Sequence, residues 1–154
     1  MGFSVSGATA LLFVAFLISF GTFYTATMGA VEQVQEAQVD EQDNSLATLN
    51  TEIDILSANY STSNGELTVV ANNTGAEPLQ PTELSLLVNG TYTAFGPGDI
   101  NITDSPENEL WAPQQQLTIT IGDSNLPGGP YDGKTVKLVT ENAVADTAQI
   151  TEVS

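Results

Sequence analysis

The chain contains no cysteine, no histidine and no arginine, and its only basic side chains are Lys134 and Lys137. Disulfides, thiol chemistry, the usual zinc sites and a histidine general base are therefore excluded. A guanidinium clamp for phosphate cannot be built either. With 19 acids and a formal net charge of −17, the chain would repel a phosphate backbone, so we expect no nucleic-acid partner.

Catalytic motifs are absent as well. The sequence has no Gly-rich phosphate loop, because Gly128-Gly129-Pro130 is a turn signal and lacks the GxxxxGK[ST] pattern. No nucleophile is followed by a recognisable base. We therefore expect a protein that is not an enzyme and that carries no cofactor.

Acidic side chains crowd two loops that are rich in glycine and proline. The first loop holds Asp99, Asp104, Glu107 and Glu109, and the second holds Asp123, Asn125 and Asp132. Such oxygens can bind Ca²⁺, but neither loop has EF-hand spacing. Paired carboxylates also serve glycoside hydrolysis, yet the domain is small and shows no aromatic sugar platform. Solvated acidic loops are the interpretation that we favour, and we expect no metal site.

The net charge predicts the medium in which the protein works. Nineteen acids against two lysines would repel one another at ordinary ionic strength. Molar salt shortens the screening length to about 3 Å and relieves that repulsion. We favour a halophilic protein over the alternative of a cation-binding surface in dilute medium.

Residues 1–31 contain no charged side chain, and their apolar centre lies at residues 11–20. A charge-free stretch longer than about 20 residues is long enough to cross a bilayer as a helix. No basic residue precedes the apolar run and no good small-x-small cleavage site follows it, so we expect an uncleaved anchor rather than a signal peptide. Residues 1–31 are thus predicted to be a membrane-anchoring helix.

One face of this helix carries small residues, with Gly21, Thr25 and Gly29 at four-residue spacing. Small residues at this spacing let a second helix approach closely, which would support a homo-oligomer. The alternative is that glycine and threonine are simply common in such segments. The hydroxyl side chains of the helix are expected to bond back to carbonyls one turn earlier.

Residues 32–50 are predicted to continue the helix as a stalk, because they are rich in Glu and Gln and contain no Gly or Pro. Val39, Leu46 and Ile53 lie seven residues apart, as do Leu49 and Leu56. This spacing resembles a short heptad repeat. An amphipathic stalk that rests on its own domain is the interpretation slightly favoured over a coiled coil.

Residues 51–154 alternate apolar and polar side chains between Asn-Gly and Gly/Pro turns, which is typical of strands. Expected strands lie near residues 53–55, 67–71, 83–88, 91–95, 116–121, 135–140 and 148–153. Seven or so short strands over about 100 residues predict an all-β, immunoglobulin-like antiparallel β-sandwich behind the N-terminal transmembrane α-helix. The expected inward set is Leu67, Val69, Leu84, Leu86, Val88, Leu117, Ile119, Ile121, Val136, Leu138 and Ile150. Trp111 is expected in the core or against a loop, with an exposed binding aromatic as the alternative.

Four N-glycosylation acceptors occur in this domain, at Asn59, Asn72, Asn89 and Asn101. The motif is short and arises by chance in an Asn- and Thr-rich chain. No Lys or Arg flanks the helix, so the positive-inside rule gives no topology. The acceptors favour a C-terminal domain outside the cytoplasmic membrane.

Several stretches resemble the haloarchaeal ArlF (FlaF) family of archaellum motor components. MGFSVSG at residues 1–7 resembles the start of that family, and FGTFYTA at residues 20–26 resembles its helix end. LTVVANNTG at residues 67–75 and VNGTY at residues 88–92 are similar to a strand-turn pattern shared by ArlF, ArlG and archaellins. KTVKLVTEN at residues 134–142 resembles their late strand.

The resemblance implies a stator. It places the helix in the cytoplasmic membrane as a single pass, with the sandwich facing the S-layer, where it would bind S-layer protein alongside an ArlG-type partner and hold the motor against torque. It carries over no functional residue. The chain departs from archaellins and pilins in lacking a basic leader and a glutamate near its start, which favours the stator. A filament subunit whose N-terminal helices pack in a filament core remains the alternative.

Overall fold

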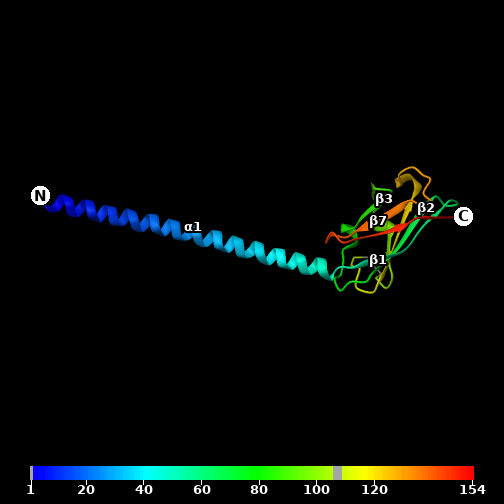
Figure 1. Cartoon of the computed structure of the whole chain (residues 1–154), viewed down its shortest axis with the longest axis horizontal. Coiled ribbons are helices and arrows are strands. Elements are labelled where there is room, and N and C mark those ends of the chain that lie inside the picture. Colours follow the sequence, from blue (N-terminus) through cyan, green and yellow to red (C-terminus); the bar gives the residue numbers. More distant parts are fainter. Residues whose placement is uncertain (1, 106–108) are drawn as a thin grey trace. The chain divides into compact units, whose positions relative to one another are not determined.

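The computed structural model describes residues 2–105 and 109–154, with side chains described from Gly7 onward. The first element is one continuous helix, α1, Gly2–Asn50 (Figure 1). It contains no proline, the residue that most strongly interrupts a helix interior. The predicted N-terminal helix is confirmed, and it continues through the predicted stalk. The chain forms two compact units, Met1–Asp43 and Asn44–Ser154.

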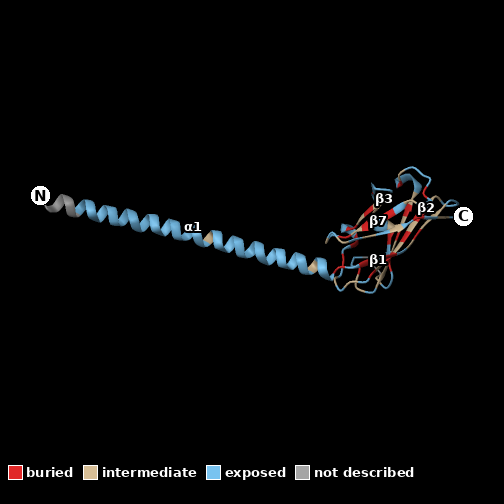
Figure 2. Cartoon of the chain, viewed as in Figure 1, coloured by how far each residue is buried: buried red, intermediate tan, exposed pale blue. Residues whose placement is uncertain are grey.

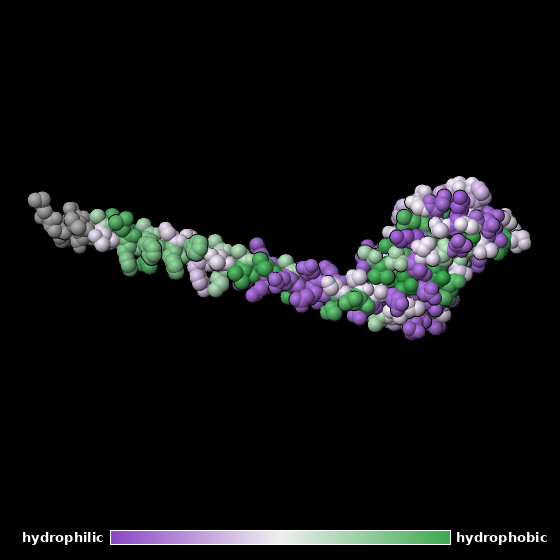
Figure 3. Space-filling model, viewed as in Figure 1, coloured by the Kyte–Doolittle hydropathy of each residue, from purple (hydrophilic) through white to green (hydrophobic). Residues whose placement is uncertain are grey.

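In the first unit, the helix contributes no core of its own. All described side chains from residue 7 to residue 43 are exposed except the half-buried Gly29 (Figure 2). Apolar residues dominate its first part and hydrophilic residues the part that follows (Figure 3). The exposed apolar side chains include Leu11, Phe13, Phe16 and Phe20. A soluble helix would cover such a surface, so this segment requires an apolar environment from outside the chain.

The second unit is a two-sheet, all-β domain, as predicted. Sheet A has the order β5-β6-β2-β1-β9, and sheet C has the order β4-β3-β7-β8. The strands are β1 Ile53–Ser61, β2 Glu66–Asn73, β3 Ser85–Val88, β4 Thr91–Thr93, β5 Ile100–Ile102, β6 Gln116–Gly122, β7 Thr135–Val139, β8 Ala145–Gln149 and β9 Thr151–Val153. Short 3₁₀ helices are η1 Pro81–Glu83, η2 Pro97–Asp99 and η3 Asp123–Asn125.

The core lies between the two sheets, and every member of the predicted inward set is buried in it. The alternation of side chains places one side of each strand inward. Buried residues therefore lie opposite each other on neighbouring strands, as Val69 and Ile119 do in sheet A and Leu86 and Leu138 do in sheet C. Trp111 is fully buried, and its indole N–H donates to Gln115 O at 2.8 Å. The core prediction for Trp111 is therefore confirmed.

Three strand predictions need correction. The first acidic loop was expected to span residues 96–113 without a strand, but it contains β5. The predicted strand at 83–88 begins only at Ser85, because η1 precedes it. The predicted strand at 148–153 is two strands, since the chain passes from sheet C to sheet A at the buried Ile150. Its second half, β9, pairs parallel with β1, whereas an entirely antiparallel sandwich was expected.

Three local details also differ from expectation. The heptad cannot extend past Asn50, because Ile53 and Leu56 belong to β1. Leu46 and Leu49 are 56% and 80% exposed, so the end of the stalk does not rest its apolar side chains on the domain. The Asn-Gly turns were expected to place both residues at positive φ. In the first hairpin only Gly65 is there, whereas both residues of the Asn89-Gly90 turn are.

Candidate anchoring and docking surfaces

The charge-free part of α1 is long enough to cross the hydrocarbon core of a membrane. Residues 2–31 of a helix span about 45 Å at 1.5 Å per residue, against about 30 Å for the hydrocarbon core. By length and composition, α1 is able to cross a membrane, and none of its apolar window is buried inside the structure. The helix therefore has the features of a membrane anchor.

Hydroxyl groups inside this segment satisfy their own hydrogen bonds. Thr25 Oγ1 donates to Gly21 O at 2.7 Å, and Thr27 Oγ1 donates to Phe23 O at 2.8 Å. Thr22 Oγ1 donates to Ser19 O at 2.9 Å. The expected back-bonding is confirmed for these threonines, and it removes most of the cost of placing their hydroxyls in a lipid environment.

The predicted packing face leads directly into an acidic one. Gly21 and Gly29 have open space where a side chain would lie, so another helix can approach there. Helical spacing continues the face of Gly21, Thr25 and Gly29 through Glu32 and on to residues 36 and 40. Any helix that packs on the small residues therefore meets carboxylates as soon as the charge-free segment ends.

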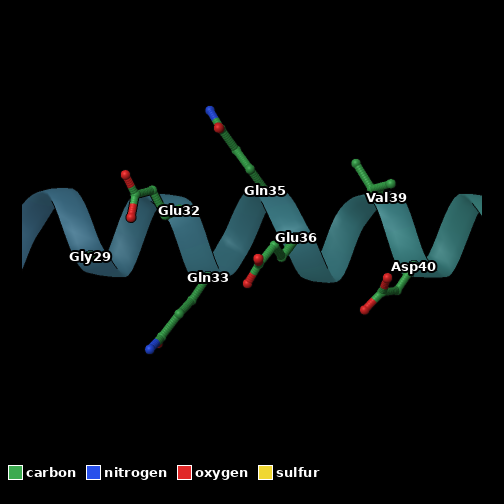
Figure 4. A pocket seen from close by; sticks show the side chains of 7 residues that line it. All are labelled: Gly29, Glu32, Gln33, Gln35, Glu36, Val39 and Asp40. Atoms are coloured by element: carbon green, nitrogen blue, oxygen red, sulfur yellow. The ribbon is translucent and has the colours of Figure 1, made fainter.

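Around those carboxylates the helix surface is open. The side chains of Glu32, Gln33, Glu36, Val39 and Asp40 project outward in different directions and enclose no cavity (Figure 4). No Lys or Arg occurs in α1, so nothing within the helix neutralises them. This segment is suited to water rather than to lipid or a dry helix bundle.

The last turn of α1 is held by the segment that follows β2. The carbonyl of Asn50 accepts hydrogen bonds from the N–H groups of Ala76 at 2.8 Å and Glu77 at 3.2 Å. The carbonyl of Glu52 accepts two more, from Thr74 and Gly75, both at 2.9 Å. A Cβ on Gly75 would collide with the carbonyl oxygen of Asn50. The position therefore requires glycine, because the two backbones are in contact.

Asn73 fixes the shape of this turn from inside the domain. Its side chain is completely buried, and its amide donates to Glu77 O at 2.8 Å and Trp111 O at 3.0 Å. Its carbonyl oxygen accepts the N–H of Gly75 at 3.1 Å. Residues 73–77, which begin with the Asn-Thr-Gly segment, thus hold the end of the helix by hydrogen bonds, and we call them the helix-end clasp.

A second contact holds the same turn from the other sheet. The Thr51 hydroxyl donates to Ala47 O at 2.7 Å and accepts the Asn142 amide at 2.8 Å. Asn142 lies in the β7–β8 turn, so residues 47–51 are bound to both sheets. Residues 47–51 are consequently held from two sides within the second unit.

Carboxylates cover one side of the sandwich, where β1, β8 and β9 meet. Asp146 accepts the N–H of Ile55 at 2.8 Å, beside a register shift in β1. Glu152 accepts the N–H groups of Tyr131 at 3.1 Å and Asp132 at 3.3 Å. Backbone donors that would otherwise invite another strand are therefore occupied on this side.

A tyrosine pair lies beside the second acidic loop. The rings of Tyr60 and Tyr131 are 4.4 Å apart, and both hydroxyls donate to Asp123 Oδ1, at 3.2 and 3.3 Å. Burial raises the pKa of both phenols above the ordinary 10.0, and the neighbouring Asp123 carboxylate raises it further. Asp123 thus has a structural role at the end of β6.

The acidic loops do not assemble a cation site in the part of the chain that is described. Asp99 accepts the N–H of Gly96 at 2.8 Å, and Glu107 lies outside the described residues. Across residues 2–105 and 109–154, no three acidic side chains gather closely enough to hold a metal ion. The calcium alternative therefore has no support from these residues.

The four acceptor asparagines are divided between two places. Three of them lie in strands of sheet A, namely Asn59 in β1, Asn72 in β2 and Asn101 in β5. The residues next to each of them along the strand point into the core, so the three asparagines lie on the outer face of the sheet. Asn89 is exposed in the β3–β4 turn, at φ 49°. Asn89 and Asn101 are exposed, and Asn59 and Asn72 are half-buried.

Solved structures include a counterpart to the fold of nearly the whole chain. The chain is similar in fold to a subunit of the archaeal flagellum of Methanospirillum hungatei strain JF1, with 18% identity, 94% of this chain and 92% of that chain covered, and a TM-score of 0.61. The periplasmic stator protein FlaG of Sulfolobus acidocaldarius is 17% identical over 64% of this chain and 97% of that chain, with a TM-score of 0.44. A chain from the periplasmic stator protein complex of FlaF and FlaG from the same organism is 17% identical over 64% of this chain and 87% of that chain, with a TM-score of 0.43.

No protein of curated function matches the sequence. The archaeal-type flagellin family model, however, matches residues 2–150, which include both the helix and nearly all of the sandwich. The match covers far more than half of the chain. The protein therefore belongs to the archaeal-type flagellin family and is a component related to the archaellum.

Proposed function

We propose that the chain is a stator component of the archaellum motor, anchored once in the cytoplasmic membrane by α1. Its sandwich lies outside the membrane, facing the S-layer, and binds S-layer protein there. An ArlG-type protein works beside it. The bound sandwich and the anchored helix together hold the motor against torque.

The charge distribution along α1 carries this proposal. Residues 2–31 are uncharged, and residues 32–43 carry five acids with no cation in the helix. A single anchored copy places the first part in lipid and the second in water, where every carboxylate is hydrated. In a filament core, many parallel copies would bring these acids together away from water, where salt screens them poorly.

A filament subunit is the second candidate. The observation in its favour is the family match over residues 2–150, since that family is named for the filament protein. The exposed apolar surface of α1 would then be covered by neighbouring copies instead of lipid. The two candidates make opposite statements about where the native protein is found.

Fractionation of motile cells separates the two candidates. We expect the chain in washed membranes, bound to S-layer protein in molar salt, and absent from filaments removed by shearing. Cells that lack it should still assemble filaments but swim poorly. Recovery of this chain as the main component of sheared filaments, together with loss of filaments in the deletion strain, would establish the filament subunit instead.

A further inference from the structure

The outer face of sheet C is free of acids in a chain that has 19 of them. The register places Leu87 opposite both Tyr92 and Lys137, and Lys137 opposite Thr147. Residues directly opposite each other project to the same side of a sheet, so these four form one row across all four strands. The rows beside it contain Ser85, Val139, Ala145, Thr135 and Gln149.

The acids that lie in or next to these strands along the chain are not part of the face. Asp146 is the only acid within these four strands, and its carboxylate accepts the N–H of Ile55 from the neighbouring sheet. Glu83 lies in η1, and Glu141 lies in the β7–β8 turn, where it accepts the N–H of Gln80 at 3.2 Å. No acceptor asparagine is on the face, because Asn89 lies in the turn at its end and the other three are on sheet A.

Lys137 is exposed at the centre of the row and has no ion-pair partner among residues 2–105 and 109–154. Tyr92 is 65% exposed on the edge strand β4. An exposed aromatic beside a patch without acids resembles the centre of a protein interface, where charge is depleted and tyrosine enriched. The row crosses four paired strands, and a sheet face of this breadth suits a protein surface better than a small anion.

We propose that the outer face of sheet C is a docking surface for an acidic protein surface, with Lys137 as its cationic anchor and Tyr92 as its apolar anchor. Charge complementarity selects the partner, because Lys137 meets a carboxylate there and no acid on the face of these four strands opposes it. In molar salt, long-range attraction is screened, so the contact acts at short range, where both groups lose water. This inference rests on the proposed function, in which the partner is S-layer protein.

The test uses the full chain in lipid nanodiscs and purified S-layer protein, in molar salt. We expect Lys137→Glu and Tyr92→Ala each to weaken binding by about tenfold or more, as expected for central interface residues. Lys134→Glu is the matched control, because it makes the same change in net charge just before β7 and outside the face, and it should weaken binding by less than about threefold. Circular dichroism in the same salt verifies that each variant is folded.

A photo-crosslinking residue introduced into the chain in living cells tests the docking face separately from the proposed stator function. At Thr147 on the face, it should capture an acidic envelope protein; at Thr120, on the outer side of β6 in sheet A, it should not. Capture at Thr147 of an acidic protein other than S-layer protein would keep the docking face and overturn the stator. S-layer binding that tolerates Lys137→Glu would keep the stator and overturn the face.

Three further outcomes would overturn the docking face. Crosslinks from Thr147 to a second copy of this chain would make it a self-association surface. Binding of protein-free anionic vesicles that Lys137→Glu abolishes would assign the face to the membrane surface. Equal losses for Lys137→Glu and Lys134→Glu would show that only total charge matters.

Discussion

Gly75 lies where the turn after β2 meets the end of α1. A side chain there would collide with the backbone at Asn50 and Glu52, which cannot move without breaking the four hydrogen bonds that hold the helix end. We expect Gly75→Ala to lower the free energy of unfolding of the domain by about 1–3 kcal/mol, the usual cost of overpacking. Chemical unfolding in molar salt measures it.

Gly122 provides the matched control for Gly75. It is the last residue of β6, at φ −74°, and nothing lies within 4 Å of the position where its Cβ would be. Gly122→Ala should therefore leave the unfolding free energy nearly unchanged, within about 0.5 kcal/mol. If both substitutions cost the same, the close contact at Gly75 is not what holds the helix end.

The sequence predicted where β2 ends, but not that Asn73 and the residues after it hold the end of α1. The strand expected at residues 67–71 was followed by Asn-Thr-Gly at residues 73–75, and β2 does end at Asn73. The burial of Asn73 depends on the carbonyl of Trp111, which lies 38 residues further along the chain. Local pattern carries no information about that distance, so only the folded domain shows why an asparagine is placed there.

At the scale of elements, α1 presents different chemistry along a single face. The face of Gly21, Thr25 and Gly29 admits another helix within the membrane and ends at Glu32. We expect Gly21→Leu and Thr25→Leu to reduce helix association, because added bulk prevents close approach. Crosslinking in membranes measures association, while the circular dichroism of the sandwich should not change.

Ala30→Leu is the control for this prediction, since its position projects away from the small-residue face and it adds comparable bulk in the same part of the helix. Its crosslinking yield should match the wild type. Equal yields from all three variants would mean that the small residues are only part of the common composition of such helices.

The strands show where sequence patterning succeeds and where it stops. Alternation located the core, because a period of two assigns every second side chain to one face. It missed β5, a strand of only three residues inside a loop rich in Gly, Pro and acids. It also predicted a single strand at residues 148–153 where the structure has the end of β8 and all of β9, because the chain changes sheet at Ile150 without interrupting the alternation.

The docking face shows the same limit. The strands that contain Leu87, Tyr92 and Lys137 were largely predicted, and their outward positions follow from the alternation. What no local pattern supplies is strand order, which places β7 between β3 and β8 and so brings Lys137 to the middle of the face. An acid-free surface is a property of paired strands rather than of any one of them.

At the scale of the whole molecule, charge is the dominant feature, and it acts on the folded domain and the stalk alike. A net charge of −17 spreads repulsion over a small protein, while Lys134 and Lys137 make no ion pair within the described residues. The carboxylates at Asp146 and Glu152 are used in hydrogen bonds to backbone N–H groups. The remaining repulsion must be met by the solvent.

We therefore expect the domain to require salt. Moving the full chain from molar salt to dilute buffer lengthens the screening distance from about 3 Å to about 30 Å, so acids across the whole domain repel one another. Its Tm, followed by circular dichroism, should fall by roughly 5 °C or more, which corresponds to about 1 kcal/mol.

Replacing the exposed Glu52, Asp54 and Glu66 by their amides should reduce that fall in Tm, because fewer charges then need screening. A Tm that is the same in both media would show that the acidic surface is not an adaptation to high salt, and it would favour a cation-binding surface instead.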